Sequence, residues 1–266
     1  KKNKFFKNVF TADNTIIFLS VKATKLEKIC YNSIKKFAKK NNVFLKKHPK
    51  ISFLKKSKTF KAKDIFMIKG EGAIDTKELF NKFDNYFKNK TNICYEDNLV
   101  KNILSYGDKY KIKCKNKKSF LTKKVVICNG AYLKKVNFPK KKNVLDVYYG
   151  IGNAIEIYDK QKILSQKLPS RTVIRSPNRG STCGIHIVPR KNSEYYLGAG
   201  SEISHKENYK SKIGTVMYLI NSFKNEIFNK ISKLNFNTVL GFRPFSFDGQ
   251  PMFGEIQDNL FVVSGT

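Results

Sequence analysis

The sequence predicts a mixed α and β fold, and three observations support that prediction. Apolar residues recur at helical spacing in three separate stretches. Between them lie short apolar or alternating runs of about four to eight residues, the usual length of a strand. The chain has 266 residues, of which 41% are hydrophobic. It can therefore bury a sizeable core, as one large domain or two interleaved smaller ones.

Two of the helices are expected in the first third of the chain. The first covers residues 24–40, where apolar side chains recur on one face and lysines fill the other. The second follows a turn at Gly70–Asp75, and either Asp75 or Thr76 can cap it. Glu78 stands where a capping box places its carboxylate. The apolar stripe of this second helix comprises Leu79, Phe80, Phe83, Tyr86 and Phe87.

Short strands are expected from residue 91 onward. The patterns predict strands at residues 93–95, 99–104, 110–114, 119–121 and 125–128. The last of these is an apolar run without alternation, which is typical of a strand buried on both faces. It stops abruptly at Asn129–Gly130.

The second half alternates in the same way. Strands are expected within residues 144–157 and 171–197, and an amphipathic helix within residues 209–228. A strand near 237–240, a turn-rich stretch over 243–254 and a strand over 259–263 close the chain.

The chain is strongly basic, with 53 Lys+Arg against 20 Asp+Glu and a formal net charge of +33. Clustered cations would indicate a nucleic-acid partner. Lysine is instead spread over nearly every segment, and the longest pure block is Lys140–Lys142. Abundant Lys, Asn, Ile and Phe without Trp is the pattern of a codon bias toward A and T. We therefore expect no specific nucleic-acid partner.

Cysteine and histidine usage indicates a reducing compartment and no metal site. The five cysteines are scattered singles without a C-x-x-C pair, and the three histidines lie far apart in the sequence. This favours neither a disulfide scaffold nor zinc. No apolar run has the length of a membrane span, and the first residues show no secretory signal. The expected location is the cytoplasm, with no transmembrane segment.

Three constellations are candidates for chemistry. A glycine after a buried strand, as at Gly130, lets backbone approach a ligand, although many strands end in such a turn. Arg243 is one of only five arginines and sits between glycine- and proline-containing turns. Its guanidinium could bind a carboxylate with two parallel hydrogen bonds, or the residue could equally be a solvated surface arginine. His186 alternates with apolar Ile185 and Ile187, a pattern that also fits an ordinary structural histidine.

Taken in order, these pieces resemble the flavin-dependent oxidoreductases of the D-amino-acid oxidase and glycine oxidase superfamily. The resemblance runs from about Gly70 onward, and no G-x-G-x-x-G, P-loop or G-x-S-x-G motif competes with it. Residues 125–131 are similar to the family's V-V-x-A-x-G-A strand. Residues 187–190 with 197–199 are similar to its I-V-P-R and I-G-A-T pair. Most specific is the stretch 241–254, which fits G-x-R-P-x-x-x-D-G-x-P-x-x-G.

The resemblance implies an FAD-binding α/β domain of Rossmann type interleaved with a mostly antiparallel substrate domain. By position, the backbone of Val100 would hold the adenine, while Asn129, Gly130 and Gly265 would approach the flavin nucleotide. Arg243 would bind the carboxylate of a small amine substrate. His186 and Ser201 fall where relatives carry a substrate-facing Tyr and a Met. No catalytic acid or base is implied, because the cofactor performs the hydride transfer.

The resemblance also implies domain bounds. Residues 71–143 and 236–266 would form parts of the FAD-binding domain and residues 144–235 the substrate domain, with residues 1–70 a mixed segment. The family opens with a G-x-G-x-x-G segment that seats the pyrophosphate. That segment is absent here, so we expect an incomplete copy of the FAD-binding domain and poor FAD binding by this chain alone.

The resemblance implies an FAD-dependent amine or amino-acid oxidase or dehydrogenase that acts on the C–N bond of an amino acid or N-methylated amine. Oxidation of a 2-hydroxy acid or of glycerol phosphate is possible on the same fold. Two readings from other classes stay open. One is a flavoprotein that acts on a modified RNA base, with lysines around its pocket. The other is a truncated relative that serves as a non-enzymatic binding module.

Overall fold

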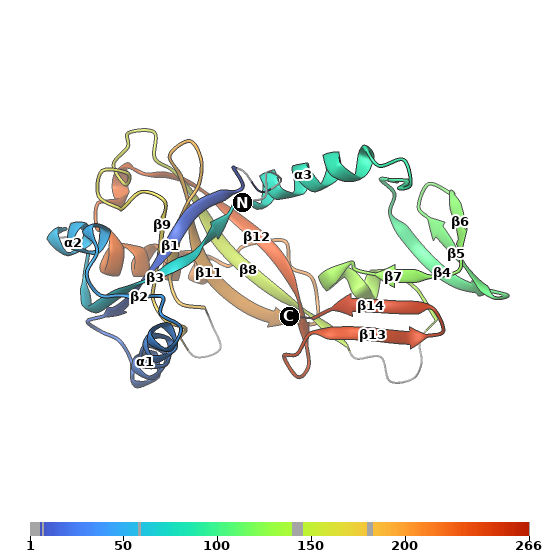
Figure 1. The fold of residues 1–266 in the computed structure, drawn as a ribbon, viewed down its shortest axis with the longest axis horizontal. Coiled ribbons are helices and arrows are strands. Elements are labelled where there is room, and N and C mark those ends of the chain that lie inside the picture. Colours follow the sequence, from blue (N-terminus) through green and yellow to red (C-terminus); the bar gives the residue numbers. More distant parts are fainter. Residues whose placement is uncertain (1–5, 7, 58–59, 140–145, 180–182, 266) are drawn as a thin grey trace. The chain divides into compact units, whose positions relative to one another are not determined.

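The computed structural model describes residues 6, 8–57, 60–139, 146–179 and 183–265. The chain has a mixed α and β fold, as the sequence predicts, and it divides into two compact units (Figure 1). Unit 1 holds residues 1–90, 153–201 and 210–240. Unit 2 holds residues 91–152, 202–209 and 241–266. The assignment of cofactor and substrate to particular segments stays a prediction.

Unit 1 is built on strands of one sheet whose order is β12-β8-β11-β10-β9-β1-β3-β2. Their bounds are β1 Phe10–Ser20, β2 Phe44–Leu45, β3 Ala62–Ile74, β8 Val147–Tyr158, β9 Thr172–Arg175, β10 His186–Pro189, β11 Glu194–Ser204 and β12 Asn235–Ser246. β3 pairs antiparallel with β1 and β2, and β10 pairs antiparallel with β9 and β11, whereas β1 and β9 are parallel. Parts of β8, β11 and β12 belong to unit 2.

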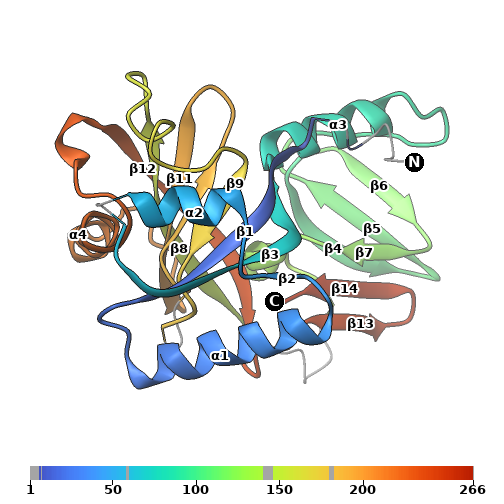
Figure 2. The ribbon, with the colours of Figure 1, turned by 60° about the vertical axis from the view of Figure 1, so that its left-hand side comes forward.

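The helices of unit 1 are α1 Lys25–Lys40, α2 Pro49–Lys56, α3 Thr76–Lys88 and α4 Ile213–Ser222, the last continued by a π turn, η3 Phe223–Ile227. Of these, α1, α2 and α4 pack on the two faces of the sheet (Figure 2). Tyr31 of α1 packs with Ile17 and Phe66 in one apolar cluster. Leu54 of α2 and Leu219 of α4 belong to the larger cluster that contains the neighbouring strand residues. Alternation along the strands sends successive side chains to these two clusters.

Unit 2 contains two three-stranded sheets, ordered β13-β14-β7 and β4-β5-β6. Their bounds are β4 Val100–Tyr106, β5 Lys109–Cys114, β6 Ser119–Thr122, β7 Val125–Ile127, β13 Met252–Gln257 and β14 Leu260–Ser264. Two 3-10 turns complete the chain, η2 Gly130–Lys135 after β7 and η4 Ile231–Lys233 in unit 1. An apolar core that includes Ile103, Ile127 and Val262 joins the two sheets.

The predicted starts of these two helices agree with the structure, but their predicted apolar faces agree only in part for α1 and not for α3. Thr24 caps α1 in a full capping box with Glu27, and the Asp75 side chain caps α3. On α1 the apolar spacing includes Ala38, which is buried together with Glu27 and Tyr31, but it also includes Leu26, Ile29 and Phe37, which are exposed. No residue of α3 is buried.

Several strand predictions are wrong. Gly70–Ile74 continues β3 rather than forming a turn, and residues 93–95 are not in a strand. Val126 is 59% exposed, so β7 is not buried on both faces. Residues 243–246 lie within β12, and only the stretch between β12 and β13 contains the predicted turn.

Candidate functional site

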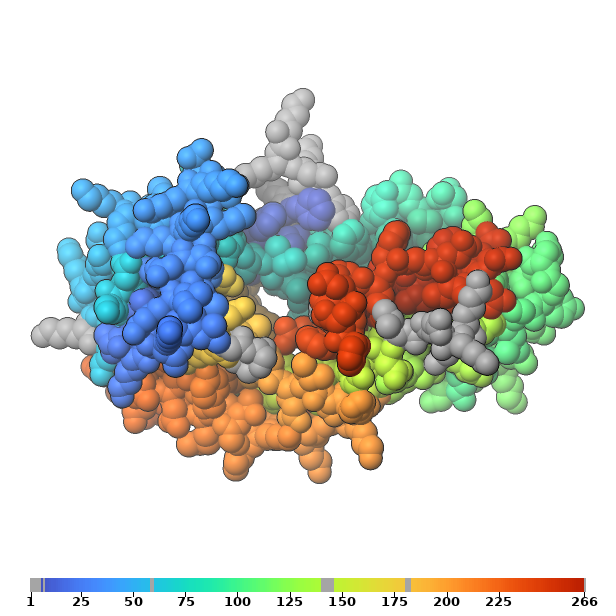
Figure 3. All heavy atoms as spheres, turned by 90° about the horizontal axis from the view of Figure 1, so that it is seen from below, coloured from blue at the N-terminus to red at the C-terminus, as the bar shows by residue number. Residues whose placement is uncertain are grey.

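The candidate site is built where two parallel strands of unit 2 end. β7 and β14 pair in parallel, with Val125 opposite Leu260 and Ile127 opposite Val262. Their carboxyl ends therefore lie at the same edge of the sheet, which is where open α/β sheets bind ligands. Asn129 and Gly130 follow β7, and Gly265 follows β14. Figure 3 shows the C-terminal strands (red) beside the yellow-green residues of the same unit.

Both glycines adopt backbone conformations that other residues rarely take. The φ angle is +56° at Gly130 and +75° at Gly265. A Cβ at Gly265 would lie 3.2 Å from the carbonyl oxygen of Gln250 and 3.3 Å from Cβ of Ser246. The hydroxyl of Ser264 donates a hydrogen bond of 3.1 Å to the carbonyl oxygen of Gly130. The two strand ends are thus fastened together, with Gly265 buried and Gly130 half-buried.

Asn129 adds an unsatisfied acceptor to this edge. Its Nδ2 donates to the carbonyl oxygen of Tyr132 over 2.9 Å. Its Oδ1 is buried and has no hydrogen-bond partner among the described residues. A buried polar atom without a partner costs free energy. A ligand that donates a hydrogen bond to this oxygen would remove that cost.

Arg243 lies next to this edge in the same unit. A Cβ at Gly130 would stand 3.9 Å from Cδ of Pro244, the residue that follows Arg243. On β8, Gly150 and Gly152 face Arg243: a Cβ at Gly152 would lie 3.7 Å from Nη2, and a Cβ at Gly150 would lie 3.5 Å from Cβ of Arg243. The guanidinium therefore extends over a strip of β8 that carries no side chains.

The sequence contains a local signal for this strip of β8. Tyr149-Gly150-Ile151-Gly152 alternates glycine with larger residues inside a strand. Glycine within a strand often marks a close approach of another group. Gly150, Gly152 and Ser264 are the residues of this site that sequence reasoning missed.

The other predicted site residues lie elsewhere in the fold. Val100 begins β4 and packs against the core of unit 2. His186 and Ser201 belong to unit 1. His186 pairs with Gly198, its ring stacks on Tyr196 at 6.0 Å, and its Nδ1 is 3.1 Å from the carbonyl oxygen of Gly184. Ile185 and Ile187 are buried on the opposite face, as the alternation predicts.

The carboxylate of Glu207 in unit 2 has an ion pair and two hydrogen bonds close to the site. Lys135 approaches the Glu207 carboxylate at 2.8 Å, the hydroxyl of Tyr149 donates to it at 2.9 Å, and that of Tyr209 donates as well. Hydrogen bonds, from Lys135 first, lower the pKa of Glu207 to about 2. The same contact raises the pKa of Lys135 to about 12. Among the described residues, no group of three His, Cys, Asp or Glu side chains is placed to hold a metal ion.

Comparison with models of known protein families shows which family the chain belongs to. The model of the DAO family, the FAD-dependent oxidoreductases, matches residues 45–266. The chain belongs to this family. DAO-family proteins use FAD, so the predicted cofactor and the mixed α/β class are both confirmed. In the part of the chain that the structure describes, no helix has the length and apolar character needed to cross a membrane.

Solved structures support the same fold for this DAO-family oxidoreductase. Glycine oxidase from Geobacillus kaustophilus is 20% identical, with a TM-score of 0.75 over 98% of this chain and 69% of that one. L-proline dehydrogenase from P. horikoshii is 14% identical, with a TM-score of 0.76 over 98% and 70%. Fructosyl peptide oxidase from E. terrenum is 11% identical, with a TM-score of 0.75 over 99% and 67%. A search of curated proteins found no match.

The residues at the edge of unit 2 fit the family's cofactor. Gly130 is half-buried and carries no side chain at the end of β7, and the buried Oδ1 of the preceding Asn129 has no hydrogen-bond donor among the described residues. The carboxyl ends of β7 and β14 supply the usual location for a nucleotide in such sheets.

Proposed function

We propose that this protein oxidises the C–N bond of an amino acid or N-methylated amine, and that Arg243 binds the carboxylate of the substrate. The observation that carries the proposal is the strip formed by Gly150 and Gly152 beneath the arginine. The guanidinium lies along this strip and Arg243 is exposed, so a planar anion can approach it and be held with two parallel hydrogen bonds. The names glycine oxidase and L-proline dehydrogenase among similar structures support an amino-acid substrate.

FAD, when bound, accepts a hydride from the carbon next to the substrate nitrogen. The chain's own residues would hold and orient both molecules. We propose that the backbone at Gly130 and Gly265 approaches the flavin nucleotide, that Oδ1 of Asn129 accepts a hydrogen bond from it, and that the backbone of Val100 holds the adenine. Arg243 would fix the carboxylate end of the substrate, which limits the orientations of the reacting C–H bond.

We propose further that His186 and Ser201 contact the substrate rather than the core. His186 lies on the opposite side of β10 from Ile185 and Ile187, and its neighbour across the strands is Gly198, which has no side chain. Ser201 lies three residues further along β11. All five cysteines are free, which supports a location in the cytoplasm, because reducing compartments maintain thiols.

A substrate screen with a matched pair of variants tests this function. Because weak FAD binding is expected, the purified protein would be supplied with excess FAD and mixed without oxygen with glycine, sarcosine, L-proline or D-alanine, and flavin bleaching would be recorded. Arg243→Ala should reduce kcat/KM on the best substrate by about 100-fold, since a charged hydrogen-bonding partner contributes about 1.5–3 kcal/mol. Arg171→Ala, which removes an exposed arginine paired with Asp13, is the control. Equal activity of Arg243→Ala and the parent protein would exclude the proposed clamp.

A further inference from the structure

Four aromatic rings of unit 2 pack together next to the candidate site. The ring centroid of Phe242 lies 5.0 Å from that of Tyr209, 5.9 Å from that of Tyr149 and 6.0 Å from that of Tyr132. Successive side chains on a strand point to opposite faces, so Phe242 lies on the other face of β12 from the neighbouring Arg243. We call these four aromatic residues the Phe242 cluster.

The carboxylate of Glu207 ties the Phe242 cluster together. It accepts hydrogen bonds from the hydroxyl of Tyr149, over 2.9 Å, and from that of Tyr209. It also forms an ion pair with Lys135, whose Nζ lies 2.8 Å from Oε1. The same Nζ stands 5.0 Å from the ring centroid of Tyr132. Glu207 therefore connects three of the four rings, directly or through Lys135, with a side chain that is only 18% exposed.

Lys135 and Tyr132 belong to η2, the turn that begins at the proposed cofactor contacts. Lys135 ends η2, and the carbonyl oxygen of Tyr132 accepts a hydrogen bond of 2.9 Å from Nδ2 of Asn129. A 3-10 turn has poorer hydrogen-bond geometry than an α-helix, so its position depends on side-chain packing. Leu133 anchors η2 in the core of unit 2. The Tyr132 ring packs edge to face with Tyr149 of β8 at 6.4 Å, and Lys135 binds Glu207.

We propose that Glu207 and Lys135 are positioning residues, whose ion pair holds η2 against β8 and β12 and so sets the place at which Asn129 and Gly130 meet the flavin nucleotide. The inference rests on the cofactor contacts of the proposed function and adds the residues that place them. The role of the pair is indirect, because it acts through the backbone of η2.

Two neighbouring lysines of the same turn provide the test. FAD would be titrated into the full chain and followed by flavin fluorescence, for Lys135→Met and for Lys134→Met. Both changes remove one positive charge from η2, but Lys134 pairs with Asp146, at 3.5 Å, rather than with Glu207. We expect FAD to bind about tenfold more weakly to Lys135→Met than to Lys134→Met, because only the first loses a charged hydrogen bond that positions the turn. Lys135→Arg keeps the charge and should recover most of the affinity.

A double-mutant cycle tests whether the two residues act as a pair. Glu207→Gln should weaken FAD binding by a factor similar to that of Lys135→Met, and the double variant should bind FAD no more weakly than the weaker single variant. Circular dichroism would establish that each variant is folded under the conditions of the titration. In Lys135→Met without FAD, amide hydrogen exchange should become faster over residues 130–136 and stay unchanged in β14, whereas a general loss of stability would speed exchange in both.

Asn129→Ala separates this inference from the proposed cofactor contacts. If Asn129→Ala weakens FAD binding while Lys135→Met and Lys134→Met bind FAD equally, the contacts stand and the positioning role is wrong. Additive losses in the double variant would also overturn that role, because the two residues would then act independently. If Asn129→Ala leaves the FAD affinity unchanged, the proposed contact at Asn129 fails and the inference fails with it.

Discussion

The hydroxyl of Ser264 donates a hydrogen bond of 3.1 Å to the carbonyl oxygen of Gly130. This bond joins the ends of β14 and β7, two parallel strands whose carboxyl ends share one edge of the sheet. Because Gly265 follows Ser264 directly, the geometry of one strand end depends on that of the other. The proposed cofactor contacts at Gly130 and Gly265 therefore belong to a single structural element.

Replacing Gly265 adds both an unfavourable backbone conformation and a steric clash, whereas replacing Gly249 adds only the first. In Gly265→Ala the left-handed backbone costs about 1–2 kcal/mol, and the new Cβ also meets the Gln250 carbonyl oxygen at 3.2 Å. We expect weaker FAD binding in titrations followed by flavin fluorescence. Gly249→Ala is the control, because its φ is +70° with open space around it. Equal FAD affinity in both variants would contradict the proposed role of Gly265.

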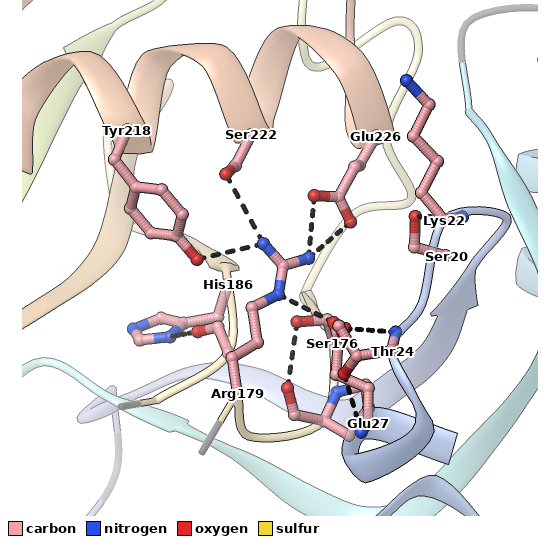
Figure 4. A network of polar contacts seen from close by, with 12 residues as sticks. Ser20, Lys22, Thr24, Glu27, Ser176, Arg179, His186, Tyr218, Ser222 and Glu226 are labelled. Carbon is pink, nitrogen blue, oxygen red and sulfur yellow. Dashed lines mark hydrogen bonds and ion pairs between the residues drawn. The ribbon is translucent and has the colours of Figure 1, made fainter. Parts of the chain in front are cut away.

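Arg179 holds an ion-pair network inside unit 1 (Figure 4). Its Nε donates to Glu27 at 2.9 Å, its Nη2 donates to Glu226 at 2.6 Å, and its Nη1 donates to the hydroxyl of Tyr218 at 3.0 Å. Glu27 is only 4% exposed. This arginine therefore ties the start of α1 to the π turn that ends α4.

Removing that arginine should be strongly destabilising. Arg179→Met leaves the buried carboxylate of Glu27 and the partly buried one of Glu226 without their cation, a change that costs about 3–5 kcal/mol. Urea unfolding followed by circular dichroism should show it as a lower midpoint. Arg171→Met removes an ion pair whose partners are 54% and 52% exposed, and it should cost at most about 1 kcal/mol. A loss of similar size in both variants would contradict the special role of Arg179.

Glycine substitutions in a strand and a helix should act in opposite directions. A Cβ at Gly72 would lie 2.0 Å from the carbonyl oxygen of Ala12, so Gly72→Ala forces β1 and β3 apart. We expect a loss of more than about 3 kcal/mol in chemical unfolding. Gly214 in α4 has nothing within 4 Å of its Cβ position. Gly214→Ala should stabilise the protein by up to about 1 kcal/mol. A tolerated Gly72→Ala would mean that these two strands can shift.

Acid should weaken the protein partly through Glu207. The pKa of its carboxyl falls from an ordinary 4.5 to about 2 in the folded state, chiefly through the hydrogen bond from Lys135. A carboxyl with a lowered pKa stabilises the fold above pH 4.5, and this contribution is lost as the pH falls from 4.5 toward 2. In Glu207→Gln, the unfolding free energy should depend less steeply on pH in that window. An unchanged slope would show that the pairing contributes nothing.

Local chemistry explains which elements the sequence could predict. Thr24 and Asp75 cap their helices through side-chain bonds to nearby backbone, so a short stretch of sequence suffices to place α1 and α3. Which face of a helix is buried depends on distant partners. Leu26 and Ile29 match the apolar spacing but are exposed, while Glu27 is buried because Arg179, about 150 residues away, pairs with it.

In the candidate site, too, local features could be predicted from the sequence and long-range contacts could not. The spacing of glycine and arginine in residues 241–254 resembles a family pattern strongly enough to single out Arg243. The pairing of β7 with β14 and the approach of β8 to Arg243 are long-range contacts, which no local pattern encodes. Val126 illustrates this limit: an unbroken apolar run suggested burial on both faces, yet its side chain is 59% exposed.

The bare strip beneath Arg243 also has a genetic consequence. A glycine codon becomes that of alanine, serine, valine or an acidic residue by one base change. Asp or Glu at position 152 would place a carboxylate against the guanidinium and occupy it from within the chain. If Arg243 binds the substrate as proposed, a single nucleotide change would block that binding without unfolding the protein, and random mutagenesis scored for lost activity should recover such changes at Gly152.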